Sequence, residues 1–525
     1  MSCMDGESWE QYMGANASLV SKDNVYGIAL YQTYRKRNPF DVDGDSFSEI
    51  GKLNMNTFGL RAYYRPTQFS RLNLEYHTTN EFRRGGNKFD LEPFETDITE
   101  QTKHVINSGG LTYDIFWKEY KHKLSFYTSA QHVDRNSYYG AQQDPNAYGK
   151  TKDLTFVGGG MYVGNFNKVL FAPATFTAGL EYQHNKMHDI MAGYNRDLVQ
   201  KVKIASAFFQ NEWKMNDFTL LAGFRLDDHN LIDNLIFSPR VNLLYKPSDA
   251  VQGRLTWSTG FRAPQAYDED LHITAVGGEG VLIRLAEGLK PEKSNSFSGS
   301  VDLSGRIGHF QTNLLIEGFY TSLNDVFYLQ NVGTDEHGNA LQERRNGSGA
   351  EVYGVNIDGK IAHGRDASLQ MGFTVQRSRY KELTFWSEDE SVAGTRNMPR
   401  TPDCYGYFTF TMAPFHNFDA SLSGVYTGRM HVPHFAPTDE IPADFPHTYI
   451  RKDELVHTPD FFDFNLKLNY TFVLNEHLKL QLNGGVQNMF NAFQKDLDKG
   501  TYRDSGYFYG PTQPRTYFIG FKLFN

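Results

Sequence analysis

The stretch FFDFNLKLNYTFVL, Phe461–Leu474, alternates apolar and polar side chains from Phe462 to Phe472. The apolar parity carries Phe462, Phe464, Leu466, Leu468, Tyr470, Phe472 and Leu474. The polar parity carries Asp463, Asn465, Lys467, Asn469 and Thr471. Successive side chains of a β-strand point to opposite faces. The stretch therefore predicts a long strand with one apolar face and one charged face.

The same alternation recurs along the chain, for example in LKLQLNGGV (478–486), FGLRAYYRP (58–66) and SRLNLEYHT (70–78). Such runs of about nine to eleven residues match the length that a tilted strand needs to cross a bilayer. Short joints between them, such as KMNDF and LNEH, alternate with long polar segments. The longest of these segments are residues 82–104, 264–294, 331–349, 381–401 and 435–459.

Composition narrows the class of protein. Aromatic residues make up 15% of the 525 residues, yet the mean hydropathy is only −0.53. No run approaches the roughly 18 apolar residues of a membrane helix, which excludes a helical membrane protein. A barrel of alternating strands keeps a low average hydropathy and fits these values. The net charge of −9 argues against a nucleic-acid partner, and Cys3 and Cys404 are too few for a disulfide framework.

We therefore expect an all-β fold, a transmembrane antiparallel β-barrel with short periplasmic turns and long extracellular loops. About twenty candidate strands begin from residue 24, and residues 13–22 form one more. If the last strand descends to the periplasm, the strand at 13–22 also descends. Its ascending partner would precede Met1. Because single-chain barrels close with an even number of strands, we expect about 21 of 22 strands to be present.

Several motifs occur in the order found in a known family. STGFRAPQAYDEDLHI (258–273) and GLKPEKSNSFSGSVD (288–302) resemble the FRAP box and the NPxLKPExS element of TonB-dependent outer-membrane receptors. NGSGAEVYGVNIDG (346–359), RNMPRTPDCYG (396–406), VQNMFNAF (486–493) and YFYGPTQPRTYFIGFKLF (507–524) resemble the later motifs of that family. The sequence FRAPQAYDEDLHI (261–273) is most similar to the corresponding segment of family members from the Bacteroidetes.

The resemblance implies that residues 1–525 are the β-barrel domain of such a receptor. The family's plug domain, a signal peptide and the first strand are expected to be absent from this sequence. The family's receptors take up a scarce ligand, such as an iron chelate, haem, a cobalamin-like vitamin or a glycan. The partners implied are outer-membrane lipid, the TonB complex acting through the plug, and the barrel-assembly machinery, although the chain ends in KLFN rather than on an aromatic residue. No organic cofactor is expected.

The segment DVDGDSFSE places Asp41, Asp43 and Asp45 at alternate positions and Glu49 four residues later. Clustered carboxylates on a loop suit Ca²⁺, which takes six to eight oxygen ligands. The spacing is not that of an EF-hand, and Asp/Gly segments are also common in ordinary turns. The resemblance adds that cobalamin receptors of the family order acidic loops in this region with Ca²⁺. The sequence leaves both interpretations open.

Three histidines are candidates for a ligand site. His272 follows the FRAP-like box, where haem receptors of the family place a ligand histidine. His431 and His434 flank the start of another long loop, and imidazole can ligate haem iron. We favour the simpler interpretation, in which all three are polar loop residues bonded to the backbone.

Two other classes of protein remain as alternatives. Some barrels are hydrolases, but the sequence has no GxSxG, HExxH, P-loop or CxxC motif. We therefore predict that the protein is not an enzyme. A passive porin or adhesin-like barrel is the other alternative, and it would apply if the parent gene lacked a plug.

Overall fold

The computed structural model describes residues 1–265, 281–334, 340–387, 389, 391–437, 441, 447, 449–504 and 506–525. One antiparallel sheet of 23 strands dominates this part of the chain. A three-stranded sheet and a two-stranded sheet lie in the connections. Within the described ranges, no helix combines the length and apolar character needed to cross a membrane.

The strands of the large sheet are β1 Ser2–Met4, β2 Ser8–Val20, β3 Tyr26–Arg37, β4 Ser48–Thr67, β5 Ser70–Gly86, β6 Ile98–Trp117, β7 His122–Ala141, β8 Tyr148–Val169, β9 Ala172–Met191, β10 Arg196–Met215, β11 Phe218–His229, β12 Ile236–Ser248, β13 Val251–Arg262, β15 Glu292–Ile307, β16 Phe310–Asn324, β19 Ala350–His363, β20 Ala367–Thr384, β21 Thr395–Asn397, β22 Cys404–Phe415, β23 Phe418–Thr427, β26 Phe461–Asn475, β27 Leu478–Gln487 and β28 Thr516–Phe524. The remaining elements are β14 Val281–Leu285, β17 Phe327–Thr334, β18 Ala340–Asn346, β24 His431–His434, β25 Glu454–His457 and the 3-10 turns η1 Pro93–Glu95 and η2 Ala192–Tyr194.

The large sheet closes on itself. Its strands pair with their neighbours in sequence order, and β1 pairs on one side with β2 and on the other with β28. Ser2 is in register with both Glu10 and Phe518. The additional strand β21 pairs only with β20, so 22 strands form the ring. The predicted 22-stranded barrel is confirmed, but the expectation that only about 21 strands are present is wrong. The partner strand expected before Met1 is β1, whose three residues lie within the chain and pair with both β2 and β28.

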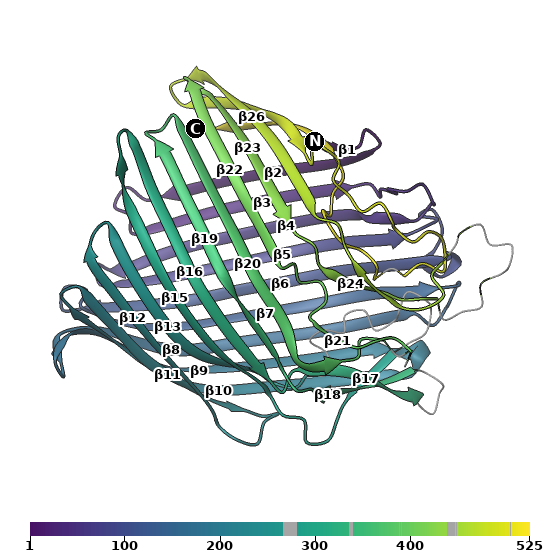
Figure 1. The fold of residues 1–525 in the computed structure, drawn as a ribbon. Coiled ribbons are helices and arrows are strands. Elements are labelled where there is room, and N and C mark those ends of the chain that lie inside the picture. The colour runs from purple at the N-terminus through teal and green to yellow at the C-terminus, as the bar shows by residue number, and fades with distance from the viewer. Residues whose placement is uncertain are drawn as a thin grey trace.

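The two ends of the barrel differ (Figure 1). At one end the joints are tight turns, such as residues 68–69 between β4 and β5 and residues 216–217 between β10 and β11. At the other end lie the long connections and the small sheets, with β17, β18 and β24 towards the right of the view. We call these the turn end and the loop end. Short and long joints alternate because each antiparallel strand returns the chain to the opposite end.

Several strands are longer than the alternation predicted. β8 has 22 residues, and β4, β6, β7, β9 and β10 each have 20. Residues 82–86, expected to begin a loop, continue β5 and pair with 99–103 of β6. Outside the zone that needs an apolar outer face, both faces of a strand can be polar. The period-two pattern then disappears although the main-chain pairing continues.

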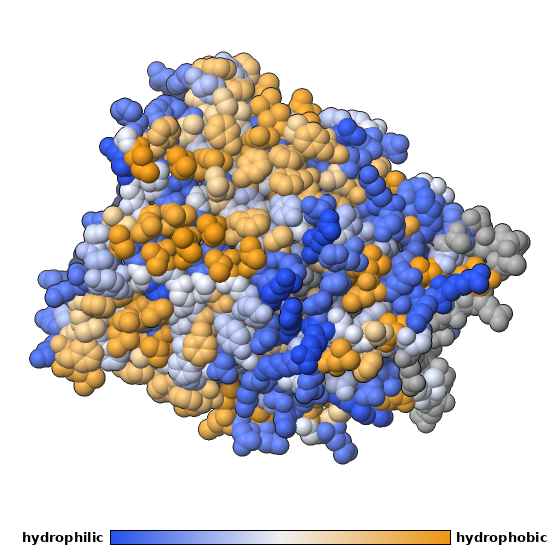
Figure 2. Space-filling model, in the orientation of Figure 1, coloured by the Kyte–Doolittle hydropathy of each residue, from blue (hydrophilic) through white to orange (hydrophobic). Residues whose placement is uncertain are grey.

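The apolar parity of the strands faces outward. Figure 2 shows apolar side chains gathered over the strands that cross the front of the barrel and polar side chains over the loop end. On β26, Phe462, Tyr470 and Phe472 on this parity are between 41% and 47% exposed. Cross-strand pairs such as Tyr426 with Phe462 extend the apolar surface from strand to strand. The opposite parity lines the interior with polar groups, as in the ion pair of Arg225 with Glu181 at 2.9 Å.

Gly485 in β27 marks a close approach between strands. A Cβ placed there would lie 2.0 Å from the carbonyl oxygen of Leu466 and 2.8 Å from the ring of Phe518. We predict that Gly485→Ala destabilises the barrel by about 1–3 kcal/mol, because backbone and ring must both move. The matched control is Gly305→Ala, whose Cβ would meet nothing within 4 Å. Urea unfolding from lipid vesicles measures both, and equal midpoints would contradict the prediction.

Candidate functional site at the loop end

Two connections that are far apart in sequence meet at the loop end. The first is residues 38–47, between β3 and β4, and the second is residues 488–515, between β27 and β28. Arg503 of the second binds Asp45 at 3.2 Å and Glu49 at 2.9 Å. Its guanidinium also lies 4.4 Å from the ring centroid of Phe47. The Asp45 carboxylate is only 1% exposed and that of Glu49 only 4%, so removing Arg503 would leave buried negative charge uncompensated.

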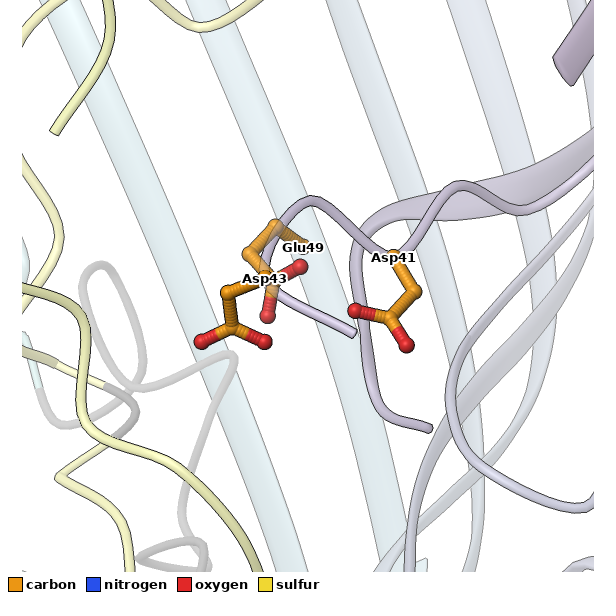
Figure 3. A group of neighbouring side chains, drawn as sticks. All are labelled: Asp41, Asp43 and Glu49. Atoms are coloured by element: carbon orange, nitrogen blue, oxygen red, sulfur yellow. The ribbon is translucent and has the colours of Figure 1, made fainter. Parts of the chain in front are cut away.

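The acidic segment divides into two parts. Carboxylate oxygens of Asp41, Asp43 and Glu49 lie within 4.8 Å of one another, and Figure 3 shows these side chains. Asp45 is not in this group. It accepts a hydrogen bond from the Gly500 N–H at 2.6 Å in addition to the Arg503 ion pair. The structure thus brings three of the four predicted ligands together. The fourth, Asp45, instead binds Gly500 and Arg503 of the connection between β27 and β28.

The three grouped carboxylates already have partners. Asp41 accepts hydrogen bonds from the N–H groups of Gly44 and Ser46, both at 2.7 Å. Glu49 accepts one from the Val42 N–H at 2.8 Å. Burial raises the pKa of Asp43, and the neighbouring charge of Asp45 raises it further. Close carboxylates favour either a proton or a cation between them.

A cavity of about 440 Å³ opens beside this contact. On the barrel side, four cationic residues near the loop ends of β3, β4 and β5 line the cavity: Arg37, Lys52, Arg83 and Arg84. The other side is formed by the last connection and includes the aromatic residues Tyr507 and Phe508. The volume is within the range of small-molecule sites. Only the tertiary fold brings these groups together, because residues 37 and 508 lie at opposite ends of the sequence.

Most acidic residues of the cavity are already engaged with protein groups. Glu49 is paired with Arg503, and Asp498 is paired with His434 at 2.9 Å. Asp504 accepts the Phe435 N–H at 2.9 Å, and burial raises its pKa. On the barrel side Arg83 is paired with Glu81 at 2.7 Å, Arg84 donates to the carbonyls of Lys88 and Leu91, and Glu100 also lines the wall. The four cations still outnumber the two acidic residues of that side, Glu49 and Glu100. Such a wall favours an anionic ligand.

His434 is a buried link between two connections. Its ring stacks on Tyr507 with centroids 3.7 Å apart, and its Nε2 lies 2.9 Å from Asp498 Oδ2. Burial alone would lower the pKa of His434, but the hydrogen bond to Asp498 and its charge outweigh burial and raise it. Tyr507 in turn donates to Asp496 at 2.6 Å. These contacts hold the last connection against β24.

The other two predicted histidines differ from His434. His431 lies across β24–β25 from His457, with ring centroids 5.0 Å apart, and its Nε2 is 3.2 Å from the Asn397 amide nitrogen. Burial lowers the pKa of His431, and the neighbouring His457 lowers it further. His272 lies outside the described residues. The haem interpretation of these three residues stays a prediction.

The sequence motifs supply contacts that hold the loop end together. Arg262 of the FRAP-like box pairs with Glu292 of the LKPE-like element at 3.4 Å, and Glu292 also accepts the Phe327 N–H at 2.6 Å. Arg400 of the PRTP-like segment donates to the Phe508 carbonyl at 2.8 Å. Asn488 of VQNMFN is 2% exposed and donates to the carbonyls of residues 492 and 513. Arg503 belongs to no quoted motif, so sequence reasoning missed it.

Comparison with known proteins agrees with the closed barrel. The sequence profile of the family described as TonB dependent receptor-like, beta-barrel, matches residues 13–489. The chain belongs to this family. Barrels of the family are outer-membrane proteins, and the family is one of receptors rather than enzymes. A search of curated protein sequences finds no match.

Solved structures of receptors have the same fold. The siderophore receptor PirA from Acinetobacter baumannii matches with a TM-score of 0.72 at 15% identity, over 98% of this chain and 77% of that one. A variant of the ferric enterobactin receptor PfeA from Pseudomonas aeruginosa, in complex with enterobactin, has a TM-score of 0.70 at 15% identity and covers 98% and 78%. The ferric-catecholate import receptor Fiu from Escherichia coli K12 has a TM-score of 0.69 at 12% identity and covers 100% and 80%.

The raised pKa of His434 predicts a pH-dependent contact. The folded state favours protonated His434, so its stabilisation is complete below the ordinary histidine pKa of about 6.5 and is lost as pH rises through the higher folded value. We predict that residues 494–509 exchange amide hydrogens faster at about pH 8 than at about pH 6, after correction for intrinsic rates.

His434→Asn should remove this pH dependence. His477→Asn, in a turn at the opposite end, should retain it. Hydrogen-exchange mass spectrometry measures the effect, and an unchanged pH response in His434→Asn would assign it to another group.

Proposed function

We propose that this barrel resides in the bacterial outer membrane and binds an anionic iron chelate of the catecholate-siderophore type for energised uptake. The observation that carries the proposal is the cationic barrel wall of the cavity at the loop end. Ferric catecholates carry negative charge and planar rings. Arginine and lysine supply charge-assisted hydrogen bonds to their oxygens, and Tyr507 and Phe508 supply aromatic surface.

The family profile supports the class of function rather than the ligand. The similar receptors are described as siderophore, ferric enterobactin and ferric-catecholate receptors. At identities of 12–15% they carry the fold alone. Haem is less well supported, because His434 is already held by Asp498 and Tyr507. A cobalamin-like vitamin has no feature of the cavity in its favour.

We propose further that transport uses a plug domain and the TonB complex, as the family resemblance implies. The described residues form the barrel wall, its turns and its connections, so they supply ligand binding and a passage. Outer-membrane lipid would surround the apolar face, and the barrel-assembly machinery would insert it. A passive pore is the alternative, and proton-gradient dependence of uptake by the full-length receptor distinguishes the two.

We predict that Lys52→Gln combined with Arg83→Gln weakens binding of ferric enterobactin at least tenfold. Each lost charge-assisted hydrogen bond costs about 1.5–3 kcal/mol, and 1.4 kcal/mol corresponds to a factor of ten. Fluorescence quenching of the purified protein by ferric enterobactin measures the affinity. The matched control is Arg306→Gln, near the turn end of β15, which should bind like the parent.

Competition with haemin and cobalamin completes this test. The proposal expects neither compound to displace the ferric catecholate at equal concentration. Saturable haemin binding without ferric enterobactin binding would overturn it in favour of a haem receptor. Equal affinity of the double variant and the parent would show that this cavity is not the binding site.

Calcium binding at Asp41, Asp43 and Glu49 is a second proposal, and the approach of their carboxylates to within 4.8 Å favours it. Lys499 lies 3.8 Å from Asp43, and Arg503 neutralises Glu49. A Ca²⁺ ion would have to compete with both cations. The expected dissociation constant is therefore at the weak end of the range, at about 10⁻⁴–10⁻³ M.

Isothermal titration calorimetry with Ca²⁺ tests this proposal. Asp43→Asn should abolish the heat of binding, and Arg503→Gln should tighten binding because it removes a competing cation. Asp366→Asn in a turn at the opposite end is the control. Absence of Ca²⁺ binding in both the parent and Arg503→Gln would leave the acidic segment with its structural role only.

A further inference from the structure

A row of four aromatic residues and one valine, called here the aromatic row, crosses the outer face of five neighbouring strands. Val241, Trp257, Phe297, Tyr320 and Tyr353 are in register from β12 to β19. They belong to the apolar parity of their strands, whereas the opposite parity of β15 carries serines and an aspartate. The row therefore faces away from the lumen and contributes to the outer surface.

The next outward row towards the turn end contains a gap. Leu255, Gly299, Gly318 and Val355 are in register there, so two glycines stand side by side in the middle. A Cβ on Gly318 would meet nothing within 4 Å. A hollow of about 730 Å³ results, with the aromatic row along one side and Leu255 at one end. We call it the glycine notch.

The outward row next to the aromatic row on its loop-end side shows how deep the notch lies in the membrane. This row consists of Thr259, Asn295, Ser322, Glu351 and Arg379, which are again in register. All of these side chains are polar or charged. Aromatic residues directly below such a row are typical of the membrane–water interface. The glycine notch lies one outward row deeper, about 7 Å further along the strands and within the hydrocarbon zone.

A cationic group stands at the interface beside the notch. Arg379 is exposed and pairs in register with Glu351. It lies two strands from Gly318, which corresponds to about 10 Å across the sheet. Arg377, opposite Tyr353, is already bound to Asp403 at 2.6 Å. The phosphate of a lipid headgroup at this level would be within reach of Arg379 while its chain entered the notch.

We propose that the glycine notch binds one acyl chain of an anionic lipid of the outer leaflet, with the headgroup phosphate at Arg379. The proposal rests on the outer-membrane location proposed above. A slot as narrow as two absent side chains admits a polymethylene chain. The surface that this slot offers to an occupant is far smaller than the roughly 800 Å² that each partner buries in a stable protein interface. A second copy of this chain is therefore a poorer occupant.

The test fills the notch and measures lipid binding. Native mass spectrometry of the detergent-solubilised protein, titrated with dioleoylphosphatidylglycerol, measures the affinity of the first bound lipid. Combined Gly299→Leu and Gly318→Leu should weaken it at least fivefold. Gly359→Leu, on the same outer face in the next rows towards the turn end, should leave it unchanged, because a Cβ there has only Met371 as a neighbour at 3.7 Å.

Two further measurements separate the chain from the headgroup. Arg379→Gln should weaken phosphatidylglycerol but not phosphatidylcholine. Phosphatidylglycerol brominated on its acyl chains should quench Trp257 fluorescence in a variant whose other tryptophans are replaced by Phe, and filling the notch should remove the quenching.

Equal first-lipid affinity in the parent and the filled variant would overturn the proposal. A dimer that only the filled variant loses would also overturn it, in favour of a second copy. Ferric-chelate binding is measured separately on the same preparations. Loss of that activity alone would therefore bear on the proposed function and not on the notch.

Discussion

Main-chain hydrogen bonding in a medium without water is the constraint on which this structure depends. Strands that cross hydrocarbon cannot leave N–H and C=O groups unpaired, so a sheet there must close. Here closure is made by β1, which pairs with both β2 and β28. Once the sheet is a cylinder, its outside meets lipid and its inside meets water and charge. The strict alternation of β26 is the consequence of this separation.

Closure also explains why the loop-end site forms where it does. In a barrel of sequential strands, the first and last connections become neighbours although they are far apart in sequence. Arg503 can therefore reach Asp45 and Glu49, and Gly500 can donate to Asp45 across 455 positions of sequence. Arg503 neutralises the buried charges of Asp45 and Glu49, and the N–H groups of Gly500 and Val42 add hydrogen bonds to these carboxylates. The same contact positions the last connection beside the cationic strand ends that line the cavity.

The two faces of the wall place different chemistry at different depths. Inside, ion pairs such as Arg225 with Asp227 at 2.7 Å stabilise charge along the lumen. Outside, the register between strands aligns side chains into rows, and each row lies at one level of the bilayer. A polar row, an aromatic row and a row interrupted by Gly299 and Gly318 follow one another. Their order along the strands gives the outer surface a defined interface and a defined hollow.

The sequence alone determined the fold class, because a period of two over strands such as 461–474 is decided by local side-chain order. The family resemblance pointed to the motifs that contain Arg262, Glu292 and Arg400 without revealing the partners of these residues. Tertiary structure decided which carboxylates converge: Asp41, Asp43 and Glu49 do, and Asp45 instead binds Arg503. It also decided the strand ends beyond the alternating zone, the cationic cavity and the glycine notch. These features depend on barrel closure and on the register between strands. Neither can be predicted from the residue sequence of any single strand.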